Sequence, residues 1–99
     1  MVKLVALYKK PADVSAFETH YKEIHAPLAK KMPGLKRLEL CHFAGSPGGE
    51  PKFYMMAELY FDTKEAMMSA LGSPEGKAAA KDVMSFAGDL IHMMFADVA

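Results

Sequence analysis

Two stretches of the chain are apolar on both sides of an extended strand, and this feature restricts the possible folds most. The run VKLVALY at Val2–Tyr8 has apolar residues on both sides apart from Lys3, and FYMMAELYF at Phe53–Phe61 does so apart from Glu58. A strand of this kind lies centrally in a sheet that is covered on both faces. With 99 residues there is room for one core, so we expect a single domain, residues 1–99.

The rest of the chain predicts helices and strands in a definite order. Polar capping residues, glycines and prolines mark where each helix begins and ends. The resulting strand–helix–strand–strand–helix–strand order is typical of an α+β, ferredoxin-like βαββαβ fold, in which a four-stranded antiparallel sheet carries helices on one face. After Val2–Tyr8 the expected elements are a helix from Asp13 to Pro33, strands over Leu35–Phe43 and Phe53–Phe61, a helix from Asp62–Glu65 to Gly72, a third, shorter helix from Ser73 through Ala80, and a strand over Leu90–Ala96.

The first helix contains a break next to a histidine. His25 borders the helix's apolar stripe, and Pro27, two residues later, has no N–H to donate to the carbonyl of Glu23. We expect a kink or a restart at Pro27. Either His25 merely ends a helix, where a cation is favourable, or the break holds the imidazole where a ligand can meet it. His20 and His25 are about 140° apart around an α-helix, so we expect them on different faces. The stripe consists of Phe17, Tyr21, Ile24 and Leu28.

The predicted fold leaves one face of the sheet without helices. The central strands are apolar on that face too, and 52% of the residues are hydrophobic, which is high for so small a chain. A second copy of the chain is the simplest cover. We therefore expect a homodimer in which two sheets face each other, a dimeric α/β barrel.

Charge and composition indicate which partners and locations to expect. Twelve basic and twelve acidic residues balance, so no basic face points to nucleic acid or to an anionic membrane. The N-terminal run MVKLVALYKK matches neither a signal peptide nor a membrane span. The single cysteine, Cys41, allows no internal disulfide and fits a cytoplasmic location, where we expect it to be a passive thiol.

Neither a cofactor nor a metal site is indicated by the motifs. The loop Gly45–Gly49 precedes a strand and not a helix, so it cannot complete a phosphate cradle, and no GxGxxG or GxxxxGK[ST] motif occurs. His42 and His92 lie on separate predicted strands, which gives only weak support for metal binding. We therefore expect no cofactor and no metal.

Glu58 is a carboxylate in the middle of an otherwise apolar strand. Burying it without a partner would be unfavourable by several kcal/mol. It therefore either reaches water at the sheet edge, or meets a cation or a polar pocket. Tyr54 and Tyr60 share its side of the strand and are candidate hydroxyl neighbours.

Four segments, taken in order, resemble the EthD family, which is named for bacterial degradation of ethyl tert-butyl ether. They are H-x-P-L-A from His25, P-G-L from Pro33, A-E-L-x-F-D from Ala57, and S-P-E-G-x-A-A-A-x-D from Ser73 with Phe86. The resemblance spans about Leu4 to Gly88. It implies a dimeric α/β barrel, a superfamily that includes muconolactone-type isomerases, polyketide cyclases and cofactor-free monooxygenases. These proteins typically keep a pocket between the sheet and the helices.

Two functions compete at this stage. In the first, the protein is a cofactor-independent enzyme of the isomerase or cyclase type that acts on a small apolar, oxygenated molecule. His25 would then be the general acid/base, with the phenol of Tyr8 and the carboxylate of Glu58 as further candidate catalytic groups. In the second, a non-catalytic accessory protein binds such a molecule in support of an oxygenase-based degradation pathway. Both require a small hydrophobic ligand in the pocket.

Overall fold

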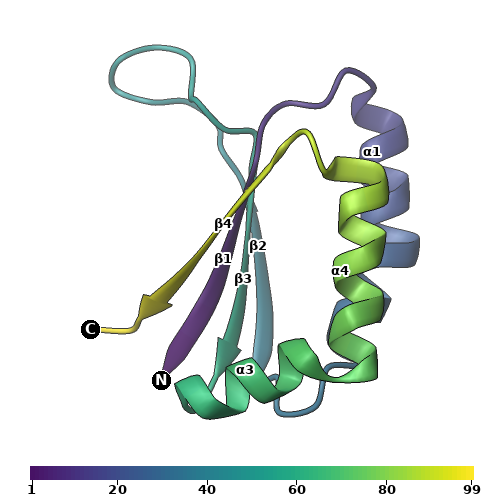
Figure 1. The fold of residues 1–99 in the computed structure, drawn as a ribbon. Helices are drawn as coiled ribbons and strands as arrows, with labels where there is room; N and C mark the ends of the chain where they lie inside the picture. Colours follow the sequence, from purple (N-terminus) through teal and green to yellow (C-terminus); the bar gives the residue numbers. More distant parts are fainter.

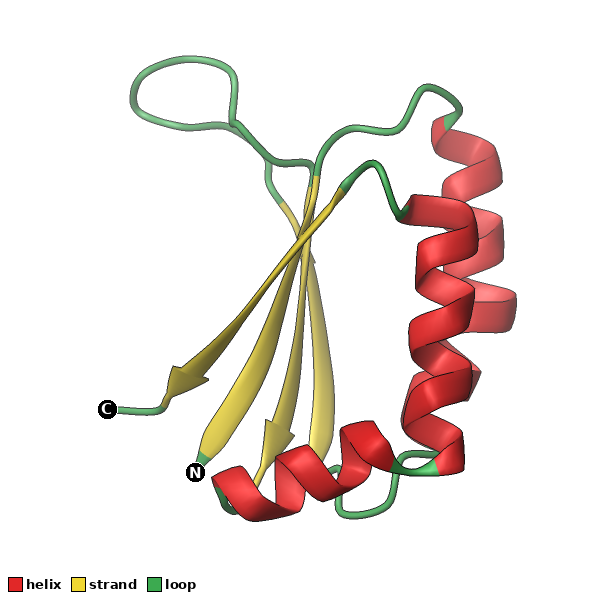
Figure 2. Ribbon diagram, in the orientation of Figure 1, coloured by secondary structure: helices red, strands yellow, loops and turns green.

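The computed structural model describes residues 1–99 as one sheet with all helices on a single face (Figures 1 and 2). The strands lie in the order β2-β3-β1-β4, and each neighbouring pair is antiparallel. The predicted ferredoxin-like α+β fold is confirmed. In chain order the elements are β1 (Val2–Tyr8), α1 (Val14–His20), the π-helical segment η1 (Tyr21–His25), α2 (Ala26–Lys30), β2 (Arg37–His42), β3 (Met55–Phe61), α3 (Lys64–Gly72), α4 (Pro74–Ala87) and β4 (Ile91–Asp97).

The core lies between the sheet and the helices. Every second residue of the central strands β1 and β3 is buried there, and the register places Leu4 opposite Leu59 and Ala6 opposite Ala57. Tyr8 and Phe61 are among the largest fully buried side chains. The helical arm from α1 to α2 and helix α4 run along the sheet, while α3 lies across the edge where β1 begins and β3 ends (Figure 1).

Each helix that starts from a loop has the side-chain cap that its sequence predicts. Asp13 accepts a hydrogen bond from the N–H of Ala16, and Thr63 accepts one from Ala66, each at 3.0 Å. Ser73 caps α4 through the N–H of Gly76. These caps satisfy N–H groups that have no partner within the helix.

The third predicted helix is longer than expected. The sequence suggested a short helix ending near Ala80, but α4 runs from Pro74 to Ala87 and is the longest helix of the chain. No glycine or proline interrupts the chain between Gly76 and Gly88, so nothing ends the helix earlier. This extension carries Asp82 and Phe86 across the sheet.

The start of β3 also differs from the prediction. The strand begins at Met55 and not at Phe53, and Tyr54 turns towards the helices. Its ring packs edge-on against Phe17, and its hydroxyl donates to Glu18 at 2.8 Å. Tyr54 therefore does not share a face with Glu58, because the regular alternation begins only after it.

The helix-free face of the sheet is partly charged. Glu58 pairs with Lys3 of the neighbouring strand, so it meets a cation, one of the two environments predicted for it. The Arg37 guanidinium lies 3.9 Å from the centre of the Tyr60 ring, and the Tyr60 hydroxyl donates to Glu39 and not to Glu58. Beside this polar cluster lie the apolar residues of the same face, Val5, Leu7, Met56 and Met94. None of the helices has the length and apolar character needed to cross a membrane.

Candidate functional site

The break before Pro27 takes the form of a π-helical turn. The N–H of Ala26 donates to the carbonyl of Tyr21, five residues earlier, and Pro27 follows without an N–H of its own. In a π-helix the residues that lie one above the other are five apart, whereas in an α-helix they are three or four apart. The prediction that His20 and His25 face different sides was therefore wrong, because it assumed α-helical geometry.

Both histidines reach the same carboxylate on α4. His20 Nε2 lies 2.9 Å from Oδ1 of Asp82, and His25 Nδ1 lies 3.0 Å from Oδ2. An ionised carboxylate only accepts hydrogen bonds, so each of these ring nitrogens carries a proton. The pairing fixes the tautomer of His25 and leaves its Nε2 with a free lone pair.

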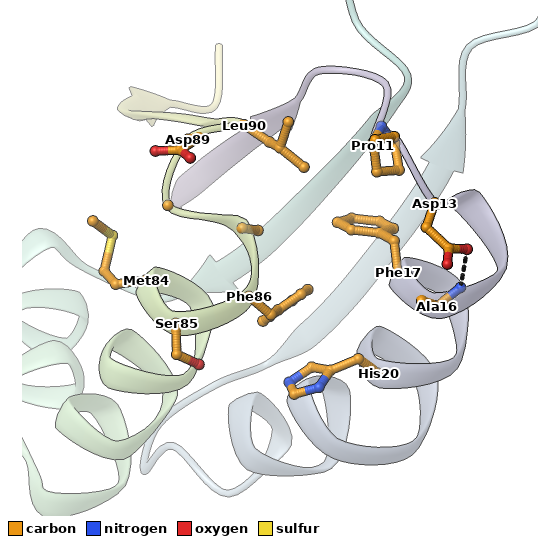
Figure 3. A pocket seen from close by; sticks show the side chains of 13 residues that line it. Pro11, Asp13, Ala16, Phe17, His20, Met84, Ser85, Phe86, Asp89 and Leu90 are labelled. Atoms are coloured by element: carbon orange, nitrogen blue, oxygen red, sulfur yellow. Dashed lines mark hydrogen bonds between the residues drawn. The ribbon is translucent and has the colours of Figure 1, made fainter.

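The aromatic side chain of Phe86 packs against both imidazoles. The Phe86 ring lies 4.2 Å from the His20 ring and 5.4 Å from the His25 ring, measured between centroids. Figure 3 shows His20, Phe86 and Phe17 side by side in an open groove of about 520 Å³ between α1 and the end of α4. His20 thus borders this groove, whereas His25 lies deeper.

His25 faces a second, more enclosed cavity between the sheet and the helices. This cavity has a volume of about 100 Å³, and 15 of its 17 lining residues are hydrophobic. Among the lining residues, only Tyr8, Tyr21 and His25 have oxygen or nitrogen atoms in their side chains. Predominantly apolar cavities with a few convergent polar groups are the usual form of small-molecule sites.

Burial determines the protonation states at this site. It lowers the pKa of His25 below its ordinary value of 6.5, against the opposing effect of Asp82. Burial raises the pKa of Tyr21 to about 12, and it raises the pKa of Tyr8, with a further contribution from the neighbouring Tyr21 phenol. At neutral pH the cavity therefore presents a neutral imidazole and two protonated phenols.

The structure brings together two of the three predicted site residues. Tyr8 and His25 line the same cavity, with the Tyr21 ring 5.7 Å from the first and 5.1 Å from the second. Glu58 lies on the opposite face of the sheet with Lys3, away from the cavity of its own chain.

Other polar side chains are placed away from the cavity. His42 pairs with Glu18 at 3.1 Å on the surface, and Cys41 is exposed on the edge strand β2. No three histidine, cysteine, aspartate or glutamate side chains are arranged to hold a metal ion.

Asp82 is the residue of the site that sequence reasoning missed. It stands in the motif that carries the family resemblance, but no role was assigned to it. A signal existed: Ala79, Val83 and Phe86 form the inward stripe of α4 at helical spacing, and Asp82 is the charged residue within that stripe. A carboxylate on a buried helix face requires a hydrogen-bond donor from another element.

The comparisons with known proteins agree with the ferredoxin-like fold and identify the family. The model of the EthD domain matches residues 9–89, and the chain therefore belongs to the EthD domain family. A protein from Rhodococcus erythropolis, described as an uncharacterised 11.0 kDa protein in the thcB-thcC intergenic region, is 38% identical over 98% of this chain and 94% of its own length. A crystal structure of an EthD family protein from Bacillus halodurans is 47% identical, with a TM-score of 0.97 over 100% of this chain and 99% of the other.

More distant structures share the fold alone. SnoaB from Streptomyces nogalater, described as a cofactor-independent oxygenase, is 17% identical with a TM-score of 0.67 over 99% of this chain and 91% of its own. Three ferredoxin-like proteins of unknown function, from Bacteroides fragilis, Jannaschia and Thermobifida fusca, are described as dimeric and are 13 to 19% identical.

Proposed function

We propose that this EthD family protein binds a small, mainly apolar, oxygenated organic molecule in the cavity, and that His25 serves there as a cofactor-independent general acid/base. One observation carries the proposal: the buried His25 lines an apolar cavity, and its Nδ1 is held by Asp82. A neutral imidazole oriented by a carboxylate is a competent base near neutral pH.

The arrangement supports proton transfer within a bound molecule. Nε2 of His25 takes a proton from a C–H or O–H group of the ligand, and the electron pair stays on the ligand. Asp82 stabilises the imidazolium that results, and the Tyr8 phenol donates a hydrogen bond to an oxygen that gains negative charge. Return of the proton to another atom completes an isomerisation. In a cyclisation the electron pair first forms a bond to a carbonyl carbon of the same molecule, and the proton then goes to that carbonyl oxygen.

The role of His25 can be tested with phenol as a probe, because phenol combines a compact apolar body with one hydroxyl group. We expect phenol to shift the NMR signals of His25, and His25→Ala to weaken phenol binding about tenfold, since one hydrogen bond in an apolar cavity is lost. His42→Ala, which removes an exposed imidazole, is the matched control and should bind like the parent chain. Isothermal titration calorimetry measures both affinities.

Native mass spectrometry of freshly purified protein would then identify a physiological ligand that copurifies. If His25→Ala folds and handles that ligand as the parent does, the protein is a binding or accessory protein and His25 is only a helix end. If phenol leaves His25 unchanged, the cavity is not the ligand site.

We further propose that each chain folds as one domain and that two copies pair through the helix-free face of the sheet. We place this dimer in the cytoplasm. Several proteins of the same fold are described as dimeric, and this face exposes apolar side chains that no helix covers. Permanent interfaces of this kind bury about 2,000 Å² or more. The Lys3–Glu58 pair would be enclosed at this interface, which gives Glu58 a role in assembly.

Sedimentation at micromolar concentration should give twice the chain mass of 10.9 kDa. Two methionines of similar exposure provide a matched pair: Met94, 46% exposed, lies on the helix-free face, and Met68, 47% exposed, lies on α3. We expect Met94→Asp to shift the protein towards monomer, because it places a charge against the partner, and Met68→Asp to remain dimeric. A stable folded monomer of the parent chain would exclude the proposed dimer.

A further inference from the structure

The cavity beside His25 is lined by both buried and exposed residues. Tyr8, Tyr21 and His25, which carry its polar side-chain atoms, are all buried. The lining also includes Met84 of α4, which is 58% exposed, and Met93 of β4, which is 50% exposed. Figure 1 shows that α4, which carries Met84, and β4, which carries Met93, diverge from the loop that joins them.

The size of the cavity requires part of its wall to move when a ring-sized ligand enters. Its volume of about 100 Å³ is smaller than the roughly 150 Å³ of an engineered cavity that holds benzene. The buried wall cannot give way easily, because protein interiors are close-packed. Met84 and Met93 are the lining residues that are both exposed and flexible, and an unbranched thioether side chain adapts readily to a new shape.

Part of the cavity wall is made of small side chains. Helix α4 contributes Gly76 and Ala79, and the sheet contributes Ala6 and Ala57. These small side chains leave space for a ligand, and the lining has no polar side chains other than those of Tyr8, Tyr21 and His25.

We propose that Met84 and Met93 form the entrance of the ligand cavity and set the length of ligand that it accepts. The ligand class that follows is a molecule with one oxygen function at a compact apolar end, which lies at His25, and an unbranched apolar chain that leaves between α4 and β4. This inference rests on the proposed function of His25, because it takes the buried polar part of the lining as the place of the oxygen function.

The proposal can be tested by comparing phenol with 4-n-butylphenol as probes in calorimetry. In the parent chain we expect the affinity to rise about threefold to fourfold for each methylene that the entrance shields from water. Met84→Trp and Met93→Trp fill the opening with a rigid ring, so each should lose at least tenfold more affinity for 4-n-butylphenol than for phenol. Met68→Trp, on an exposed methionine that does not line the cavity, is the matched control and should preserve the preference for the butyl chain.

The outcomes separate this inference from the proposed function. If phenol shifts the His25 signals but the two entrance variants keep the chain-length preference of the parent, the chain leaves elsewhere and the entrance assignment is wrong while the site stands. If neither probe shifts His25, both the site and its entrance are wrong. The assignment is supported if both entrance variants lose the preference for the butyl chain and Met68→Trp keeps it.

Discussion

Replacing Gly76 with alanine is expected to lower the free energy of unfolding by about 3 kcal/mol or more, or to prevent folding. A Cβ at this position would lie 2.1 Å from the carbonyl oxygen of Ala70 and 2.7 Å from that of Leu71, both in the backbone of α3. Backbone atoms of a packed helix cannot move aside as a flexible side chain can. Helices α3 and α4 would have to separate.

Gly72→Ala provides the matched control for this prediction, measured by urea denaturation. Gly72 is also helical, but a Cβ there meets nothing within 4 Å. We expect its effect to be within about 1 kcal/mol and to favour stability, since alanine is the better helix former. Because Gly76 also lines the cavity that we propose as the ligand site, a Gly76→Ala chain that folds should bind phenol less tightly. Equal stabilities of the two variants would contradict the close approach of α3 to α4.

Much of the fold follows from residues whose local chemistry allows few alternatives. Asp13, Thr63 and Ser73 each begin a helix because their side chains satisfy N–H groups that the helix cannot, and the sequence shows them plainly. Val2–Tyr8 is apolar on both sides, and this predicted the central position of β1, because a central strand is covered on both faces. Strand ends were harder, since the turn of Tyr54 towards Glu18 depends on a helix that is distant in sequence.

The site was only partly predictable, because its geometry depends on departures from regular structure. His25 and Tyr8 were candidates from the sequence, and they line one cavity. The pairing of His20 with His25 could not be derived from α-helical spacing, since it requires the π-helical turn. Asp82 becomes part of the site only when α4 is packed against that turn.

Asp82→Asn is expected to have the second large effect, because it acts on two histidines together. The asparagine keeps the size of the side chain, but its NH₂ group cannot accept the proton of a ring nitrogen. One of the two histidine hydrogen bonds is therefore lost, unless that histidine changes its tautomer. We expect the free energy of unfolding at pH 7 to fall by about 1–3 kcal/mol, as for other buried groups that lose a charged partner.

The direction in which stability changes with pH follows from the lowered pKa of His25. Burial lowers the pKa of His25 below 6.5 in the folded chain, so between the two values the unfolded chain binds more protons than the folded one. Stability then increases with pH through that window, and it decreases as the pH falls below about 6.5. Asp82 opposes the lowering, so Asp82→Asn should depress the pKa of His25 further and extend the acid-sensitive window to lower pH.

NMR titration of the His25 ring, together with urea denaturation at several pH values, measures both effects. Glu18→Gln is the matched control: it removes the charge that His42 contacts at 3.1 Å on the surface, where solvent screens the pair, while its amide oxygen still accepts the Tyr54 hydroxyl. We expect Glu18→Gln to change stability by no more than about 0.5 kcal/mol and to leave the titration of His25 unaltered. An unchanged pKa of His25 in Asp82→Asn would show that the carboxylate does not hold the imidazole. Tyr21 and Phe86 would then be the groups that orient it, because their rings are the aromatic groups packed against it.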